Sequence, residues 1–259
     1  MRLMHQYSGL CASSYDLLLP EEEIEDTGFF RNAIEENGQP ALEIGCGTGR
    51  LILKFLEDGL DVEGVDSSGE MLAILQRKAK ERGLKACTHE QLMQSLDLSQ
   101  RYRTIYVPVA SFMLVPQLDQ AARALSGFHH HLEPGGKVMI PLLLPWKEDI
   151  ATSAAPAGKW RLRRESNQQE DNRTVRCWEL ATYDFQQQLK LSQLRFEVIS
   201  DGQIRATEER QFSLRWYTQE QFASMLRQAG FCDIHAVRDY SLQPAQPDDA
   251  SFSFIATKP

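Results

Sequence analysis

Three alternating glycines directly after a short apolar run constrain the fold of this chain more than any other feature of its sequence. The segment Ala41–Arg50 is ALEIGCGTGR, with glycines at Gly45, Gly47 and Gly49. A strand that enters a helix through such glycines brings bare backbone close to a ligand, at the carboxyl end of a parallel sheet. The G-x-G-x-G spacing departs from the G-x-G-x-x-G of dinucleotide-binding loops. It therefore favours a ligand without a pyrophosphate.

Two further segments agree with this interpretation. Val62–Asp66 is VEGVD, and a carboxylate at the end of a second strand can accept hydrogen bonds from both hydroxyls of a ribose. His131–Ile140 is HLEPGGKVMI, in which a Gly-Gly turn precedes another apolar strand. An ordinary tight turn is the alternative for G-x-G-x-G alone. The agreement of three segments favours a nucleotide site.

Apolar runs alternate with helical patterns over the first part of the chain, which predicts parallel βαβ units and a doubly wound sheet. We expect strands at 41–44, 62–65, 105–109 and 137–144, and helices at 21–37, 51–58, 68–82 and 121–132.

The pattern changes between Lys159 and Arg215, where short alternating runs predict an antiparallel β insertion with turn tips at Asp171-Asn172 and Asp201-Gly202. A helix at 218–229 and strands at 232–237 and 252–256 are expected to follow.

Composition excludes several classes of protein. The formal net charge of −8 argues against a broad nucleic-acid-binding surface, because such surfaces are basic. No stretch approaches the roughly 20 apolar residues of a membrane span, and the N-terminus lacks the apolar core of a signal peptide.

The cysteines and histidines predict no metal site. The five scattered cysteines lack a C-x-x-C pair and are expected to be reduced thiols of a cytoplasmic protein. His129–His131 is interpreted as a solvated helix end, because adjacent helical residues point in different directions.

The three motifs resemble those of class I S-adenosylmethionine (SAM)-dependent methyltransferases. ALEIGCGTG is similar to the glycine-rich motif of that family, VEGVDSSGEML to its ribose-binding strand and the helix after it, and HLEPGGKVMI to its LxPGG strand. The resemblance implies an α/β, Rossmann-like seven-stranded sheet with an antiparallel last strand and an antiparallel β insertion before the sixth strand. It implies an N-terminal lid and SAM-binding core at 1–150, the insertion as a substrate roof at 151–216, and completion of the core sheet at 217–259.

The same resemblance implies SAM as the cofactor and S-adenosylhomocysteine as the product. Gly45 and Gly47 would lie against the methionine part of SAM and Glu43 would help to hold that end. Asp66 would bind the ribose, and Leu92-Met93 would face the adenine. The complete set of expected cofactor residues is Tyr15, Glu43, Gly45, Cys46, Gly47, Gly49, Asp66, Ser67, Met71, Gln91, Leu92, Met93 and Val109.

Two positions depart from the family pattern. The family often has an Asp near the adenine, where this chain has Leu92-Met93, so an adenine contact would come from backbone or from Gln91. The residue after the ribose carboxylate is commonly apolar, and here it is Ser67.

The loop after the fourth strand bears on the class of methyl acceptor. Val107–Phe112 is VPVASF, unlike the [DNS]-P-P-[YFW] loop of enzymes that methylate nucleobase amines. It resembles the loop of small-molecule methyltransferases. The resemblance is closest to the branch with a Tyr-Asp-Leu-Leu segment, here Tyr15–Leu18, which includes amino-sugar N-methyltransferases and glycine or sarcosine N-methyltransferases. In that branch an N-terminal tyrosine closes over SAM, and the insertion roofs the substrate cavity.

Methyl transfer needs alignment of nucleophile, carbon and sulfur, and a general base only if the acceptor arrives protonated. Ser111 and Tyr217 are the candidate catalytic residues. The expected substrate-binding residues are Ser111, Phe112, Trp146, Arg215 and Tyr217. Packing of the insertion onto the core is the alternative for Trp146, Trp216 and Tyr217. A solvated strand face is favoured for Arg161, Arg163 and Arg164 over contact with an anionic acceptor.

The leading hypothesis is methyl transfer to N or O of a small molecule by a monomer or homodimer, without nucleic-acid or membrane partners. One alternative is a protein or RNA methyltransferase that docks its substrate through the insertion. The other is a SAM-binding sensor without transferase activity.

Overall fold

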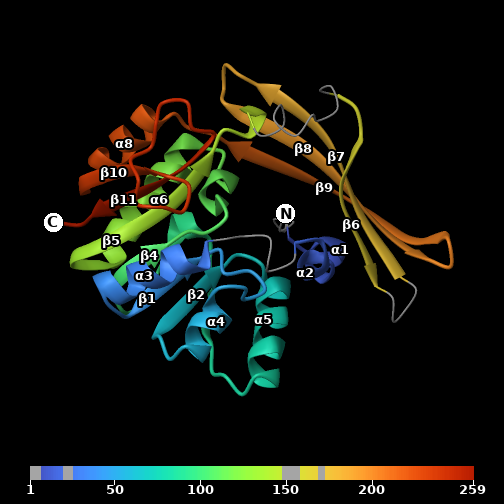
Figure 1. The fold of residues 1–259 in the computed structure, drawn as a ribbon, viewed down its shortest axis with the longest axis horizontal. Coiled ribbons are helices and arrows are strands. Elements are labelled where there is room, and N and C mark those ends of the chain that lie inside the picture. The colour runs from blue at the N-terminus through green and yellow to red at the C-terminus, as the bar shows by residue number, and fades with distance from the viewer. Residues whose placement is uncertain (1–6, 20–25, 148–157, 169–172) are drawn as a thin grey trace.

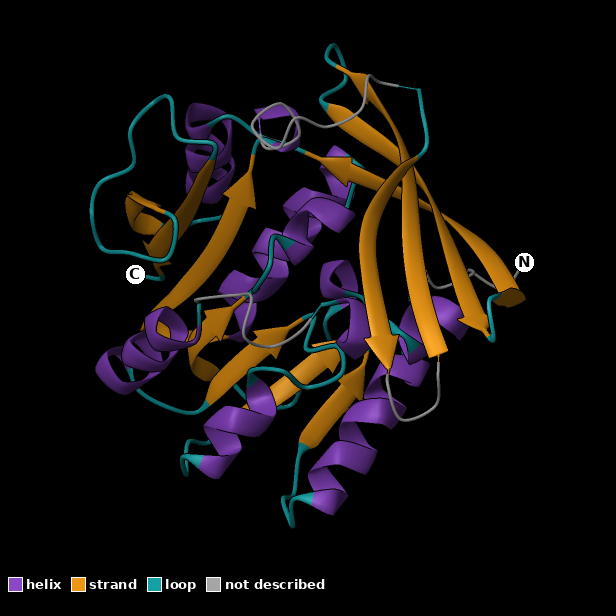
Figure 2. Cartoon of the chain, turned by 45° about the vertical axis from the view of Figure 1, so that its right-hand side comes forward, coloured by secondary structure: helices purple, strands orange, loops and turns teal. Residues whose placement is uncertain are grey.

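The computed structural model describes residues 7–19, 26–147, 158–168 and 173–259. Its ribbon contains a larger α/β body and a separate antiparallel sheet, with the short N-terminal helices between them (Figure 1). A view turned by 45° shows the strands of the second sheet standing beside the α/β body (Figure 2).

The α/β body is built on a seven-stranded sheet with the order β10-β11-β5-β4-β1-β2-β3. The strands in chain order are β1 (Ala41–Ile44), β2 (Val62–Asp66), β3 (Cys87–Glu90), β4 (Tyr102–Tyr106), β5 (Leu132–Leu143), β10 (Cys232–Arg238) and β11 (Ser251–Thr257). Neighbouring strands among the first five pair in parallel, and β11 pairs antiparallel with both β5 and β10. The predicted seven-stranded sheet with an antiparallel last strand is confirmed.

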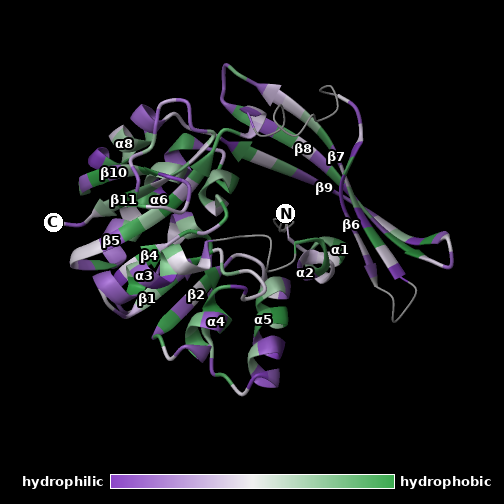
Figure 3. Cartoon of the chain, viewed as in Figure 1, coloured by the Kyte–Doolittle hydropathy of each residue, from purple (hydrophilic) through white to green (hydrophobic). Residues whose placement is uncertain are grey.

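Helices cover both faces of this sheet. They are α3 (Thr27–Asn37), α4 (Ile52–Glu57), α5 (Gly69–Glu81), α6 (Leu118–His131) and α8 (Gln219–Gln228). One apolar cluster joins the sheet to α6 and α8, and a second joins it to α3, α4 and α5. Figure 3 accordingly shows hydrophobic residues on the central strands and hydrophilic residues on the outer turns of α5 and α8.

Local signals explain where two of these helices begin. Ser68 caps α5, and its side chain accepts a hydrogen bond from the Met71 backbone N–H. Thr218 and Gln221 form a reciprocal capping box at the start of α8. Both satisfy backbone donors that a helix start leaves unpaired.

The insertion is a four-stranded antiparallel sheet of β6 (Arg161–Gln168), β7 (Arg173–Asp184), β8 (Leu189–Ser200) and β9 (Gln203–Arg215), paired in chain order. Asp201 and Gly202 connect β8 to β9 with φ angles of 51° and 73°, as a two-residue hairpin requires. The predicted turn at Asp171-Asn172 and the start of the helix predicted from Glu21 lie outside the described residues.

The inner face of the insertion packs on the N-terminal helices α1 (Gly9–Ser13) and α2 (Tyr15–Leu18). Cys11 and Leu18 of these helices form an apolar cluster with Val175, Phe196 and Phe212 of the sheet. The N-terminal helices thus connect the insertion to the α/β body.

Two local predictions need correction, and one strand was not predicted. The strand predicted at 105–109 ends at Tyr106, since Pro108 has no N–H for a sheet ladder and Val109 and Ala110 are left-handed, with φ angles of 53° and 56°. Strand β3 is polar and partly exposed, so its sequence carries no strand pattern. The histidine cluster does not form a wholly solvated helix end.

His131 is the residue that departs from that interpretation, because it is 4% exposed. Its Nε2 accepts a hydrogen bond from the Leu98 backbone N–H at 3.2 Å, and its Nδ1 lies 2.8 Å from the Gly127 carbonyl oxygen. This histidine therefore anchors the loop before β4.

A buried ion pair fixes the glycine loop to the chain that precedes α3. The two terminal guanidinium nitrogens of Arg50, Nη1 and Nη2, donate to the Asp26 carboxylate oxygens at 2.6 and 2.7 Å. The Asp26 side chain is fully buried and that of Arg50 is 13% exposed. Two parallel charge-assisted bonds of this kind fix the orientation of both groups.

We expect Asp26→Asn to lower the free energy of unfolding by about 3–5 kcal/mol, because it leaves the buried Arg50 charge uncompensated. Urea denaturation measures this difference. The control is Arg31→Gln, which breaks the more exposed Arg31–Asp58 pair and should cost less than about 1 kcal/mol. Equal losses for the two variants would contradict the prediction.

Candidate functional site

A cavity of about 420 Å³ opens at the carboxyl ends of β1 and β2. It brings together residues from the two glycine-containing motifs, from the N-terminal segment before them, and from two later stretches at 91–94 and 111–120. The lining residues that the sequence predicted are Tyr15, Gly45, Gly47, Asp66, Ser67, Met71, Gln91, Leu92, Met93 and Ser111.

The glycine loop forms the floor of this cavity. Gly45, Gly47 and Gly49 have φ angles of 77°, 53° and 92°, a region that L side chains rarely adopt. A Cβ on Gly45 would lie 3.1 Å from the Ser111 side chain, and a Cβ on Gly49 only 2.8 Å from Leu75. Gly45 and Gly47 line the cavity, whereas Gly49 allows the loop to pack against the helices behind it.

The Asp66 carboxylate stands at the end of β2 and is oriented by backbone donors. The Gly47 N–H donates to its Oδ2 at 2.9 Å and the Ser68 N–H to its Oδ1 at 2.8 Å. These two bonds connect the glycine loop to the start of α5. The carboxylate therefore stands at the edge of a cavity of ligand size, with its oxygens as hydrogen-bond acceptors.

Two tyrosines close the cavity from the N-terminal side. The Tyr7 ring packs edge-on against Tyr15 at 5.8 Å and against Phe212 of β9 at 5.2 Å. Burial raises the pKa of Tyr15 to about 12, so its hydroxyl stays protonated at neutral pH. Sequence reasoning missed Tyr7, because no motif surrounds it and only its contact with Phe212 reveals its place.

The N-terminal helices are held over the cavity by polar contacts from three directions. The Gly9 N–H donates to Glu70 at 2.7 Å, and the Leu10 N–H donates to Glu208 of β9 at 2.9 Å. Asp16 of α2 accepts a hydrogen bond from Thr48 of the glycine loop. The N-terminal helices therefore contact the glycine loop, α5 and the insertion.

Glu43 lies behind the glycine loop and does not line the cavity. Its carboxyl group is buried and accepts a hydrogen bond of 3.0 Å from the Tyr106 hydroxyl. Burial raises the pKa of Glu43 to about 8, although Tyr106 and Arg50 act in the opposite direction.

The remaining expected cofactor residues lie around the cavity or have other partners. Cys46 is buried, and Val109 lines a second cavity, of about 630 Å³, beside Leu143 and Tyr240. Gln91 reaches the first cavity, but its amide oxygen and nitrogen bond the backbone N–H and carbonyl of Asp97. The Gln91 side chain therefore fixes a loop.

Most of the expected substrate residues are structural in this conformation. Phe112 is fully buried and Tyr217 is 2% exposed, and both belong to the main apolar core. Arg215 donates to the carbonyl oxygens of Pro116 and Gln187. Trp146 packs against Phe185 with ring centroids 6.0 Å apart. Ser111 alone of this group lines the first cavity, and its hydroxyl donates to the Pro108 carbonyl at 2.7 Å.

Comparison with known proteins agrees with this geometry. Residues 41–136 match the family model described as a methyltransferase domain. A putative methyltransferase of Geobacillus is 23% identical over 252 residues, which span 94% of this chain and 96% of that protein. The chain is a class I SAM-dependent methyltransferase.

Relatives whose names state a substrate match this methyltransferase over shorter stretches. An amino-sugar N,N-dimethyltransferase of Streptomyces venezuelae, named for dTDP-3-amino-3,4,6-trideoxy-α-D-glucopyranose, is 28% identical over 105 residues. That stretch spans 40% of this chain and 41% of the relative.

Solved structures share the fold over nearly the whole chain. A SAM-dependent methyltransferase from Clostridium acetobutylicum superposes with a TM-score of 0.77 at 18% identity, covering 95% of this chain and 97% of that one. The sugar N-methyltransferase KedS8 from Streptoalloteichus gives 0.70 at 19% identity, covering 90% and 86%. None of the described helices of this methyltransferase is long and apolar enough to cross a membrane.

The buried carboxyl of Glu43 predicts a pH dependence of stability. Its pKa rises from an ordinary value of 4.5 to about 8 on folding, so between these values the unfolded chain loses a proton that the folded chain keeps. The contribution of Glu43 to stability is fully present below pH 4.5 and decreases as pH rises towards 8. Glu43→Gln removes this titration. We expect the stability of the variant relative to the unaltered protein to increase from pH 5 to pH 9 in urea denaturation, and a difference independent of pH would contradict this assignment.

Proposed function

We propose that this methyltransferase transfers the methyl group of SAM to a nitrogen or oxygen atom of a small-molecule acceptor. The observation that carries the proposal is the closure of the cavity by Tyr7 and Tyr15, with Phe212 of the insertion packed behind Tyr7. The cavity volume falls within the range of about 300–1,000 Å³ that is typical of small-molecule sites. Tyrosine rings that cover one side of the site also limit the access of water to the reacting atoms.

The cofactor assignment follows from the groups that line the cavity. We propose that the Asp66 carboxylate binds the ribose hydroxyls and that the backbone at Gly45 and Gly47 contacts the methionine part of SAM. Leu92 and Met93 offer apolar surface to the adenine. Glu43 and Gly49 support the loop from behind, where they lie in the structure.

The acceptor side of the cavity carries neutral polar groups. Ser111, Gln117 and Gln120 follow the carboxyl end of β4 and line the cavity with Leu114 and Pro116. Hydroxyl and amide groups suit an acceptor with several hydrogen-bonding groups of its own. The amino-sugar methyltransferases among the relatives act on compounds of this kind.

The chemistry we propose rests on alignment. The described lining residues with ionisable side chains are Tyr7, Tyr15 and Asp66, and burial raises the pKa of both tyrosines. An acceptor amine would therefore enter in its neutral form and attack the methyl carbon in line with the sulfur, as the C–S bond breaks and S-adenosylhomocysteine leaves. Holding the two reactants in that geometry supplies the rate enhancement.

We assign residues 1–150 to lid and core, 151–216 to the substrate roof and 217–259 to completion of the sheet.

Asp66→Ala tests the cofactor assignment. We expect it to weaken SAM binding about 10- to 100-fold, because a hydrogen bond to a charged group contributes ~1.5–3 kcal/mol. Calorimetric titration with SAM measures the change. Asp58→Ala, at the C-terminal end of α4 and outside the cavity lining, should leave the affinity unchanged. Unchanged affinity in Asp66→Ala would remove the ribose assignment.

Transfer of a labelled methyl group tests the acceptor class. The protein is incubated with methyl-labelled SAM and, in separate reactions, with amino-sugar nucleotides and small metabolites, with a peptide pool, and with RNA. We expect label only in a small-molecule product, and less of it with Asp66→Ala at a SAM concentration below the dissociation constant of that variant. Label in peptide or RNA would overturn the proposal in favour of a macromolecular substrate. Tight SAM binding without label in any fraction would overturn it in favour of a sensor.

A further inference from the structure

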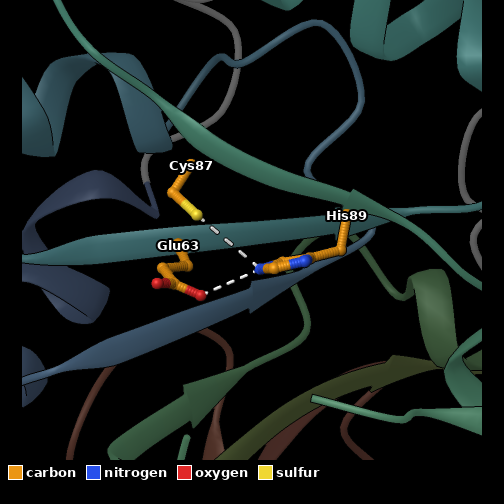
Figure 4. Close-up of side chains that lie close together, drawn as sticks. All are labelled: Glu63, Cys87 and His89. Carbon is orange, nitrogen blue, oxygen red and sulfur yellow. Dashed lines mark hydrogen bonds and ion pairs between the residues drawn. The ribbon is translucent and has the colours of Figure 1, made fainter. Parts of the chain in front are cut away.

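Three side chains with metal-binding donor atoms converge on β2 and β3, outside the cavity. They are Glu63, Cys87 and His89 (Figure 4). The His89 Nε2 lies 2.9 Å from the Glu63 Oε2 and 3.7 Å from the Cys87 Sγ. All three donor atoms lie within 4.8 Å of one another.

Sheet geometry brings these residues together. Cys87 and His89 are two positions apart on β3, so their side chains leave the same face of the strand. Glu63 pairs directly with Cys87 in the parallel register of β2 and β3. The arrangement depends on strand pairing, and the spacing in sequence gives no sign of it.

A fourth residue orients the carboxylate. The Tyr102 hydroxyl donates to the Glu63 Oε2 at 2.8 Å, and the Tyr102 side chain is buried. The Glu63 carboxylate is therefore held from behind, as outer partners hold the ligands of metal sites.

We propose that Glu63, Cys87 and His89 bind one zinc(II) ion, with a water molecule as the fourth ligand. A thiolate, an imidazole and a carboxylate together suit zinc and exclude calcium and magnesium, which take oxygen ligands. Tetrahedral zinc with bonds of about 2.0–2.3 Å places its ligand atoms roughly 3.3–3.6 Å apart. The distances of 2.9 and 3.7 Å differ from these values by a few tenths of an ångström, and the third pair of ligand atoms lies within 4.8 Å.

The site is open to solvent. Cys87 is exposed, and the His89 side chain is 33% exposed, so an ion can enter from solvent. On binding, the Cys87 thiol loses its proton to solvent and binds as thiolate. His89 binds as neutral imidazole through Nε2 and keeps its proton on Nδ1.

Binding here would connect the edge strand β3 to β2 near the cofactor cavity. Asp66 ends β2 three residues after Glu63, and the cavity residues Gln91–Met93 follow β3 directly. An ion that binds only the folded chain stabilises it. Zinc is therefore expected to raise the melting temperature and to hold the adenine side of the cavity in place.

Cobalt(II) titration of the full-length protein without an affinity tag is the direct test, since cobalt occupies zinc sites and absorbs visible light. We expect about one equivalent to produce tetrahedral d–d bands and a thiolate-to-cobalt charge-transfer band, and zinc to abolish them by competition. Cys87→Ser should lose the charge-transfer band, because it removes the thiolate. His89→Gln should lose the tetrahedral spectrum, because it removes the imidazole ligand. The matched control is Cys232→Ser, because Cys232 also lies beside a carboxylate, that of Asp233. It should retain both.

Two further measurements distinguish a specific metal site from adventitious binding. Tyr102→Phe should weaken metal affinity about 10- to 100-fold, as loss of an outer hydrogen bond to a ligand does. Zinc should raise the melting temperature of the unaltered protein and not that of Cys87→Ser. The proposal is overturned if cobalt gives no bands, or if the bands persist in Cys87→Ser. These readouts do not involve methyl transfer, so they stand or fall independently of the proposed acceptor.

Discussion

The carboxylate of Asp66 joins the two segments on which the rest of the site depends. By accepting from Gly47 and Ser68, it connects the turn after β1 to the start of α5. Parallel strands end at one edge of the sheet, so these two neighbouring strand ends meet. Because the glycine backbone is bare, a cofactor can approach it closely. The proposed SAM side of the cavity is thus built from backbone geometry and one charge.

Buried charges behind the loop hold this geometry. The Arg50–Asp26 pair fixes the residue after the last glycine, and Glu43 lies beneath the loop with its hydrogen bond from Tyr106. Such groups are costly to bury and must be paired or neutral. The structure uses both solutions within a short stretch of chain: a paired carboxylate at Asp26, and at Glu43 a carboxyl whose pKa burial raises to about 8.

The N-terminal helices and the insertion depend on each other. Cys11 and Leu18 pack into the inner face of the insertion, while Glu208 of that sheet accepts from the start of α1. Tyr7 closes the cavity only because Phe212 supports its other side. If the proposed site is correct, closure over the cofactor and the shape of the acceptor space depend on the same packing, which links the proposed lid to the proposed substrate roof.

The sequence by itself predicted the part of the fold that forms the proposed SAM site. Glycine spacing, a carboxylate at a strand end and the β–α alternation are local patterns, and they predicted a doubly wound parallel sheet with a nucleotide site, while short alternating runs predicted the antiparallel insertion. The resemblance of these motifs to a known family implied the seven-stranded sheet and SAM as cofactor. Even so, the limits of single elements depended on more than periodicity. The fourth strand ends early because Pro108 and two left-handed residues turn the chain, and the polar edge strand β3 forms because β2 offers it a partner.

Only the tertiary structure decided the contacts between distant segments. In the structure Tyr7 lies over the cavity, and Phe112 and Tyr217 are buried in the core. Arg215 donates to two backbone carbonyls. The structure also brings Glu63 to Cys87 and His89. Sequence periodicity reports which face of an element is buried. Which side chains of different elements meet depends on strand register and on packing between layers, and neither is encoded in local spacing.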